Sequence, residues 1–322
     1  MKNYRPLVHI SVFVILIFIS FQNQYNPFMI NDVRHVSTVL KEIPDKKDPL
    51  YKKITIANEK LTEPPEDAWV DRVWKKTPGR NGISINIEDS FRKMKKEDKY
   101  DPSLLVYEQT PPDVNIDDLP AAPIYRGHPE KNMVSFLINV SWGTEHIPAI
   151  LQVLKKHHIK ATFFLDGKWA KEHVDLVKMI DDEDHIIGSH GYNHPNMKQL
   201  NKQENNKQIK QTNDIIHAIT GHTPKWFAPP SGSYDQEVIE IVDSMDMETV
   251  LWTVDTIDWK HPSTSVMINQ VMKNIHPGAT ILMHPTPVIE DGLETLIEQI
   301  EEEGYQFGSV ERLLSPERES IR

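Results

Sequence analysis

Two histidines separated by three residues, His190 and His194, are the first candidates for chemistry in this chain. They lie in the run from Gly188 to Pro195, which follows a short apolar stretch ending at Ile187. Glycine and proline in this run disfavour a continuous helix and predict a loop after a strand. Two imidazoles on a loop that folds back can direct nitrogen atoms at one ion, and zinc and related divalent metals favour such ligands. Because this spacing is also common among surface histidines, the interpretation depends on the rest of the chain.

The elements that must position these histidines form a regular series of strands and helices. Strands are predicted at 134–139, 159–165, 185–187, 226–227, 249–254, 280–283 and 306–309. Helices are predicted between them, at 147–157, 168–181, 203–219, 236–244, 265–275 and 293–303. Such alternation predicts an α/β domain with a parallel sheet. The number of short units predicts closure into a barrel, whose functional loops follow the carboxyl ends of the strands.

A third histidine, His284, follows the predicted strand at 280–283 and precedes Pro285. Its position places it at the same end of the predicted barrel as His190 and His194, because parallel strands present their carboxyl ends to one face. We therefore expect His284 to face the same cleft.

The composition excludes several classes of function. The chain has 322 residues, enough for one large domain with a sizeable core and a smaller region. Its formal charge of −11 argues against generic binding to nucleic acid, because that binding requires basic patches. There are 0 cysteines, which excludes a thiol nucleophile, a disulfide scaffold and a cysteine zinc site.

The first residues have the pattern of a secretory signal. Lys2 and Arg5 precede an apolar run at 7–21, which is short for a membrane-spanning helix of about 20 residues. The run is not followed by a convincing small-x-small cleavage site, so a cleaved signal peptide and a signal-anchor stay open for residues 1–24. Either alternative places the rest of the chain outside the cytoplasmic membrane, anchored or secreted.

Composition also divides the remaining chain. Residues 25–66 are polar and predicted to be a tether, with short helices within it as an alternative. Residues 67–110 are predicted to form a small α+β region. Within that region we predict a helical turn at 70–74, strands at 83–87 and 104–107, and a helix at 88–99. The region is interpreted as an accessory module or as a strut that packs on the main domain. A proline-rich linker at 111–130 separates it from the main domain at 131–316.

The main domain resembles the polysaccharide deacetylase family, which has the NodB-type fold of carbohydrate esterase family four. It resembles in particular an uncharacterised, sporulation-associated subgroup of bacilli. The matching segments are 161–164, 189–195, 227–232, 255–259 and 281–285. The resemblance implies a distorted (β/α) barrel and an N-acetylated polysaccharide as substrate or ligand. It does not indicate a protein partner.

The resemblance also implies roles for individual residues. His190 and His194 are expected to bind a divalent metal, with zinc favoured. His284 is expected to be the general acid, and Asp258 the carboxylate that orients it. The expected substrate-binding residues are Trp259, Leu282, Pro230 and Ser231. Trp259 and Leu282 match the apolar walls of an acetyl pocket, and plain core packing is the alternative for both.

The chain departs from the family at three linked positions. Active relatives carry Thr-Phe-Asp-Asp-Gly at the end of the first strand, where the first aspartate is the base and the second binds metal. The corresponding positions here are Asn139 and Val140, and a usual arginine of the third motif is replaced by Ala228. An amide does not take up a proton at neutral pH, and an isopropyl group offers no lone pair.

Three interpretations therefore remain. The first is a hydrolase that removes N-acetyl groups from cell-wall glycans such as peptidoglycan or chitin-like polymers. The second is an inactive glycan-binding or structural protein of the cell envelope, which the residues at 139, 140 and 228 favour. The third is a redesigned hydrolase in which Asp166 or Glu145 supplies the missing carboxylate. The ordinary roles of these two residues are a turn residue before Gly167 and a carboxylate at a helix start.

Overall fold

The computed structural model describes residues 46–319. Contacts divide the chain into one compact unit at 53–322 and another before it. The predicted signal or anchor at 1–24 lies outside the described residues. No helix within 46–319 is long and apolar enough to cross a membrane.

The main domain is built on a curled parallel sheet, in agreement with the predicted α/β class. Its strands lie in the order β10-β11-β5-β6-β7-β8-β9, and β12 also pairs with β5. The strands are β5 (Met133–Val140), β6 (Thr162–Leu165), β7 (Ile186–Ser189), β8 (Trp226–Phe227), β9 (Glu248–Thr249), β10 (Val254–Asp255), β11 (Thr280–Met283) and β12 (Gln306–Phe307). Every residue of β5 is buried, as expected for a central parallel strand covered on both faces.

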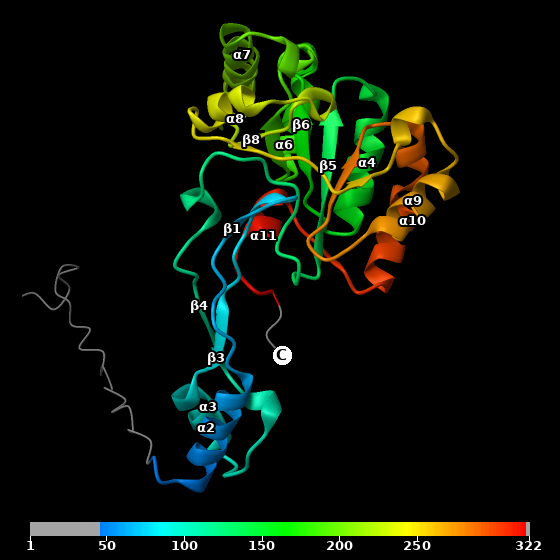
Figure 1. The fold of residues 1–322 in the computed structure, drawn as a ribbon. Helices are drawn as coiled ribbons and strands as arrows, with labels where there is room; N and C mark the ends of the chain where they lie inside the picture. Colours follow the sequence, from blue (N-terminus) through cyan, green and yellow to red (C-terminus); the bar gives the residue numbers. More distant parts are fainter. Residues whose placement is uncertain (1–45, 320–322) are drawn as a thin grey trace, which may run out of the picture. The chain divides into compact units, whose positions relative to one another are not determined.

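Helices follow most of these strands and cover the outside of the sheet (Figure 1). They are α4 (Ile147–Lys156), α5 (Gly167–Glu172), α6 (Val174–Asp182), α7 (Lys202–Thr220), α8 (Gln236–Asp243), α9 (Thr264–Asn274), α10 (Pro287–Glu302) and α11 (Val310–Leu314). In α4 the residues at helical spacing, Ile147, Ile150, Leu151 and Leu154, are the buried ones. They join the large apolar cluster between the helices and the sheet.

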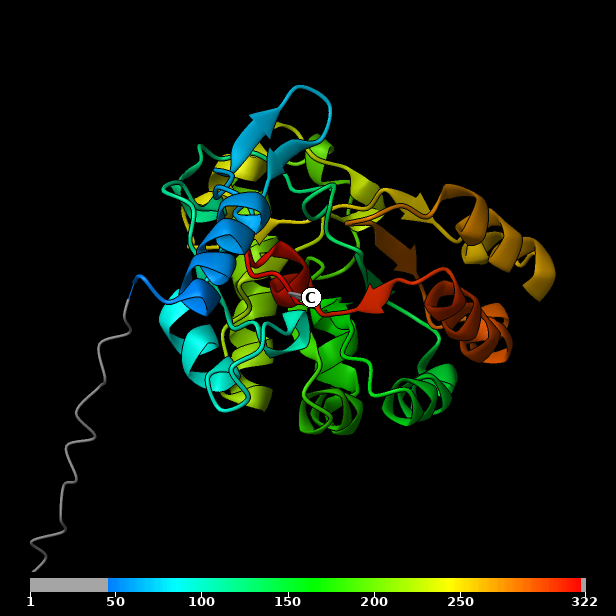
Figure 2. The same ribbon diagram turned by 90° about the horizontal axis from the view of Figure 1, so that it is seen from below.

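The prediction of a closed barrel was wrong in one respect. Within residues 46–319 no strand pairing joins β9 to β10, so the sheet is a curled half-barrel. The predicted linker occupies part of this gap, because Ile124 pairs with Val250 and Arg126 with Ala279. A second apolar cluster fills the inside of the curve, where α11 contributes Val310. Helix α11 lies at the centre of the view from below (Figure 2).

Two predicted elements of the main domain are divided in the structure. The helix at 168–181 is interrupted at His173, whose φ of −130° and ψ of 49° leave the helical range. The strand at 249–254 divides into β9 and β10. Thr249 pairs with β8 and Val254 with β11, whereas Val250 forms only an isolated bridge with Ile124. The interruption at His173 produces a short helix, α5. Its first residues hydrogen-bond to the loop at 190–195 that carries His190 and His194, called the histidine loop below.

The small region before the main domain is α+β, as predicted, but one of its elements was predicted wrongly. Residues 70–74 form part of a hairpin between β1 (Trp69–Asp71) and β2 (Lys75–Thr77), not a helical turn. Asp71 Oδ1 accepts hydrogen bonds from the N–H groups of Val73 and Trp74, which closes the turn.

The other elements of this region follow the predicted order with shifted ends. They are β3 (Gly82–Ile85), α3 (Ile87–Met94) and β4 (Tyr107–Thr110). Helix α2 (Pro49–Leu61) comes before the hairpin. Strand β4 pairs antiparallel with β3 and starts where the predicted strand at 104–107 ends. Helix α2 falls within the range predicted as a polar tether.

Candidate functional site

A cavity of about 350 Å³ lies at the carboxyl ends of the strands. It is lined by Asn139, Ser141, Trp142, His190, His194, Ser231, Trp252, Asp255, Trp259, Leu282 and His284. These residues lie in the last two positions of strands β5, β10 and β11 or in the segments that follow β5, β7, β8, β9, β10 and β11, so the parallel topology brings them together.

The two neighbouring positions at the end of β5 differ sharply. Asn139 lines the cavity with 4% of its surface exposed, and no protein group within residues 46–319 hydrogen-bonds its buried Oδ1 atom. Val140 is fully buried and belongs to the large apolar cluster between the helices and the sheet. A side chain packed in this way contributes to the core and offers no ligand atom to a metal.

His190 is held in one orientation by its backbone neighbour. It follows β7 directly, is almost fully buried, and donates from Nδ1 to the carbonyl oxygen of Ala228 at 2.7 Å. Burial lowers its pKa to about 3, with a smaller contribution from the neighbouring His194. The ring is therefore neutral with an unprotonated Nε2, which is the form in which histidine binds a metal.

His194 lies at the exposed end of the same loop. Gly191 has a φ of 74° and His194 a φ of 53°, and these two left-handed residues turn the chain back. The ring centroids of His190 and His194 are 5.2 Å apart. The loop therefore brings the two imidazoles together, as their sequence spacing predicts.

The opposite side of the cavity holds a histidine supported by a carboxylate. His284 Nδ1 donates to Asp258 Oδ1 at 2.9 Å. Asp258 has 0% of its surface exposed, and its other oxygen accepts from the backbone N–H of His284 and from Thr286. Thr256 donates to Oδ1 as well. This arrangement fixes the imidazole, and no group within residues 46–319 hydrogen-bonds its Nε2.

The predicted substrate-binding residues do not all reach the cavity. Trp259, Leu282 and Ser231 line it, whereas Pro230 is buried and does not. Trp259 is exposed while Leu282 is buried, so core packing explains Leu282 better than Trp259.

Four lining residues were not predicted from the sequence: Ser141, Trp142, Trp252 and Asp255. Trp142 could have been found, because it lies two residues after the end of a buried strand, where side chains fall on the functional face. It is 43% exposed, and its ring stacks on His284 with an angle of 8° between the planes. It also lines an adjacent groove of about 700 Å³, which Lys168, Trp169 and other residues complete.

The position that carries an arginine in active relatives is occupied by a buried alanine. Ala228 is buried in the inner apolar cluster, which also contains Leu137 and Phe164. Its carbonyl oxygen supports His190, and its N–H donates to the carbonyl oxygen of Ser189. The backbone at this position thus holds the histidine loop, and its side chain serves packing.

Neither proposed replacement for the missing carboxylate lines the cavity. Asp166 caps α5 by accepting from Trp169 N–H at 3.0 Å, and it lines the adjacent groove. Burial raises the pKa of Asp166 to about 6, although backbone N–H groups, including that of His194, counteract this effect. Glu145 is exposed and approaches His146 at 3.6 Å. Glu145 therefore has the helix-start position expected of it, and Asp166 is the N-cap of α5 and not only a turn residue.

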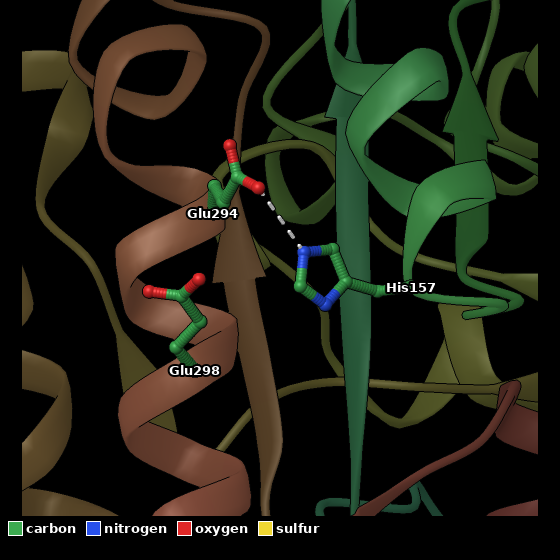
Figure 3. A group of neighbouring side chains, drawn as sticks. All are labelled: His157, Glu294 and Glu298. Atoms are coloured by element: carbon green, nitrogen blue, oxygen red, sulfur yellow. Dashed lines mark hydrogen bonds and ion pairs between the residues drawn. The ribbon is translucent and has the colours of Figure 1, made fainter.

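The residues present match a family metal site only in part. His190 and His194 supply two nitrogen atoms, but no third donor joins them within the described part of the chain. The one His/Asp/Glu group there with three donor atoms within 4.8 Å of one another is His157, Glu294 and Glu298. Figure 3 shows these side chains extending from α4 and α10.

That group is separate from the cavity. His157 follows the end of α4, so it lies toward the opposite end of the domain from the cavity at the strand ends. The Lys156 ammonium already pairs with Glu294, and His157 Nε2 lies 3.5 Å from the same carboxylate. We therefore attribute this group to surface ion pairing.

The comparisons with known proteins agree with the geometry. A model of the polysaccharide deacetylase family matches residues 126–250. The uncharacterized protein YlxY of Bacillus subtilis (strain 168) is 44% identical over 315 residues, which are 98% of this chain and 99% of the relative. A peptidoglycan-N-acetylglucosamine deacetylase of Bacillus cereus is 36% identical over 180 residues, which are 54% of this chain and 66% of the relative.

Solved structures include a close neighbour of the whole described domain. A protein of Bacillus anthracis, described as a CE4 family pseudoenzyme, has a TM-score of 0.80 and 47% identity. The match covers 84% of this chain and 96% of that chain. A mutant of the same protein is described as having restored enzymatic activity, and it matches with a TM-score of 0.80 and 46% identity over 84% of this chain and 99% of that chain.

Proposed function

This chain belongs to the polysaccharide deacetylase family, and from that premise we propose that it binds N-acetylated cell-wall glycans in its cavity without hydrolysing them at an enzyme's rate. One observation carries the proposal. At the end of β5 an amide stands in the base position, and a fully buried valine stands in the position of the metal-binding carboxylate.

The missing base has a direct consequence for turnover. Deacetylation requires a base that deprotonates the attacking water and an acid that protonates the leaving amine. Asn139 cannot do the first, and loss of general-base help typically lowers the rate by about 10²–10⁴-fold. The walls of the cavity, in contrast, do not depend on a base, so glycan binding can persist without hydrolysis.

Zinc is the metal that the two histidines would favour. Deacetylases of this family are generally metalloenzymes, in which the metal supplies the activated water. His190 presents a neutral Nε2, and His194 lies beside it. Metal sites usually use at least three protein ligands, and Val140 removes the third. We therefore propose weak zinc binding, with no catalytic step that depends on it.

A second candidate function is a slow deacetylase. The His284–Asp258 pair favours it, because a fixed histidine with a free Nε2 is suited to protonate an amine. Under this alternative, water supplies part of the base function and the rate is low.

We also propose that the domain acts outside the cytoplasmic membrane, anchored or secreted. Lys2, Arg5 and the apolar run at 7–21 support this location. A protease added to intact, wall-stripped cells should digest the domain. The location would be contradicted if the domain stayed intact in unlysed cells while the same protease digested it in lysed cells.

One paired experiment separates the two functions. The purified chain is assayed for metal content, acetate release and binding with N-acetylated chitooligosaccharides and peptidoglycan. We expect glycan binding with no acetate release above a buffer control. Acetate release by the parent chain, lost on replacing His284→Ala, would establish the slow deacetylase. Absence of both binding and release would reject both functions.

A further inference from the structure

The amide in the base position has a structural peculiarity of its own. Asn139 is 4% exposed, yet the protein leaves its Oδ1 without a hydrogen bond within residues 46–319. Leaving a buried acceptor unpaired lowers the stability of the fold. Val140, the next residue, shows that this strand end accepts an apolar side chain. If the side chain at position 139 had no role, an apolar residue there would make the fold more stable.

A second polar group lies on the same side of the chain. Ser141 is two residues from Asn139, lines the same cavity, and has a buried Oγ with no protein partner in the described chain. Residues two apart at a strand end point to one face. This end of the cavity therefore offers an unpaired carbonyl-type acceptor and an unpaired hydroxyl donor.

The remaining walls near these groups restrict what can bind. Trp259, Leu282 and Trp252 line the cavity, and its volume of about 350 Å³ limits the size of the group that enters. An acetamido group has an apolar methyl, one N–H donor and one carbonyl acceptor. Those three features match the apolar wall, the Asn139 acceptor and the Ser141 hydroxyl.

We propose that Asn139 and Ser141 recognise the intact acetamido group of an N-acetylated sugar. The Asn139 carboxamide oxygen accepts the amide N–H, and the Ser141 hydroxyl donates to the acetyl carbonyl. The inference rests on the proposed glycan-binding function and makes it more specific. Asn139 is then a ligand-binding residue, and the protein distinguishes acetylated from deacetylated glycans.

The test compares two ligands and two strand positions. Full-length parent protein and variants are titrated calorimetrically, in chelator, with tetra-N-acetylchitotetraose and with its fully deacetylated counterpart. Asn139→Leu preserves the approximate shape and removes the acceptor, and Ser141→Ala removes the donor. Ser135→Ala is the matched control, because its Oγ is equally buried and unpaired on the same strand and does not line the cavity.

We expect the parent to prefer the acetylated ligand. Asn139→Leu and Ser141→Ala should each weaken binding of that ligand by about tenfold, which is the loss of roughly one hydrogen bond, and should leave the deacetylated ligand unaffected. Ser135→Ala should match the parent. Thermal melting of each variant confirms that it is folded.

Three results would overturn the inference. If Asn139→Leu and Ser141→Ala bind the acetylated ligand as tightly as the parent, water alone satisfies these groups and glycan binding itself survives. If each variant weakens both ligands equally, the side chains shape the cavity without recognising the acetyl group. If the parent binds neither ligand, the proposed function fails and this inference fails with it.

Discussion

On one side of the cleft the Asp258 carboxylate accepts four hydrogen bonds, and on the other the Asn139 oxygen accepts none from the described protein. The first group is joined to Thr256, His284 and Thr286, which lie at the ends of two different strands or beyond them. The second lies at the penultimate position of β5, and its buried oxygen has no hydrogen-bond partner within residues 46–319. The two sides therefore differ in how strongly the fold itself requires them.

This difference changes how the intact residues should be interpreted. Removing Asp258 would leave several buried donors unpaired, so the fold retains it whether or not the protein is an enzyme. The presence of the His284–Asp258 pair is then weak evidence for catalysis. The end of β5, where no comparable network exists, is the more informative side.

The largest expected effect comes from rebuilding the altered side. Asn139→Asp, Val140→Asp and Ala228→Arg together restore the base, the third ligand and the cation that orients the base. We expect acetate release from N-acetylated chitooligosaccharides in zinc to rise by about 10²–10⁴-fold or more over the parent.

Two controls accompany that variant. Asn139→Asp alone should gain little, because catalytic groups that act together are not additive. Ala228 is buried in an apolar cluster, so the arginine can prevent folding, and the variant without it is tested in parallel. If the parent already releases acetate as fast as the rebuilt protein, another residue supplies the base, and Asp166 is the first to replace.

The next prediction compares the stability of the two sides directly. Asp258→Ala should lower the free energy of unfolding by about 3–5 kcal/mol, because it breaks a buried charged network. Asn139→Ala should lower it by less than about 1 kcal/mol, because the lost packing is offset by removal of an unpaired acceptor. Denaturant unfolding measures both. Equal losses would mean that Asn139 has a structural partner.

The strand pattern explains why much of this fold was predictable. Apolar runs such as β5 and helices with one apolar face such as α4 are specified locally, and their alternation determines a parallel sheet. Closure is not specified locally. It depends on which strands reach each other, and here Ile124 of the linker pairs with Val250 near the open edge.

The site was predictable to the extent that it depends on strand ends. His190, His194 and His284 were brought together by topology, as expected. Trp142 was missed because it lies outside the family motif as quoted, although it is only two residues beyond the end of β5. The unpaired state of Asn139 could not be predicted, because it depends on the neighbours in three dimensions and not on sequence spacing.

The pH dependence of the free energy of unfolding tests a histidine at the other end of strand β7 from the cleft. Strand β7 has His190 after its carboxyl end and His185 before its first residue. Burial lowers the pKa of His185 to about 4 from 6.5, and its Nδ1 accepts from the N–H of Ala161. Between about pH 6.5 and 4 only the unfolded chain binds this proton, so stability falls as the pH falls through that range.

The expected loss from His185 is on the order of 3 kcal/mol and is complete below about pH 4. His185→Gln keeps an acceptor for Ala161 and does not titrate, so its free energy of unfolding should fall less steeply over the same range. The charged groups near His185, which are Lys160, Glu183 and Asp184, are the same in both proteins, so the difference between the two slopes reports on His185. Identical slopes for parent and variant would assign the acid sensitivity to other groups.

The smallest expected effect is that of zinc on the parent protein. With two histidines and no third ligand, zinc at a concentration equal to its dissociation constant stabilises the fold by about 0.4 kcal/mol. The melting temperature should then rise by about 1 °C, and His190→Ala with His194→Ala should abolish the rise. The variant with aspartates at positions 139 and 140 should show a larger rise, because a buried carboxylate gains most from a cation. A rise of several degrees in the parent would contradict an incomplete site. It would mean that another carboxylate reaches the histidines when zinc is bound, and Asp166→Asn would then test the nearest one, since Asp166 lines the groove that also contains His194.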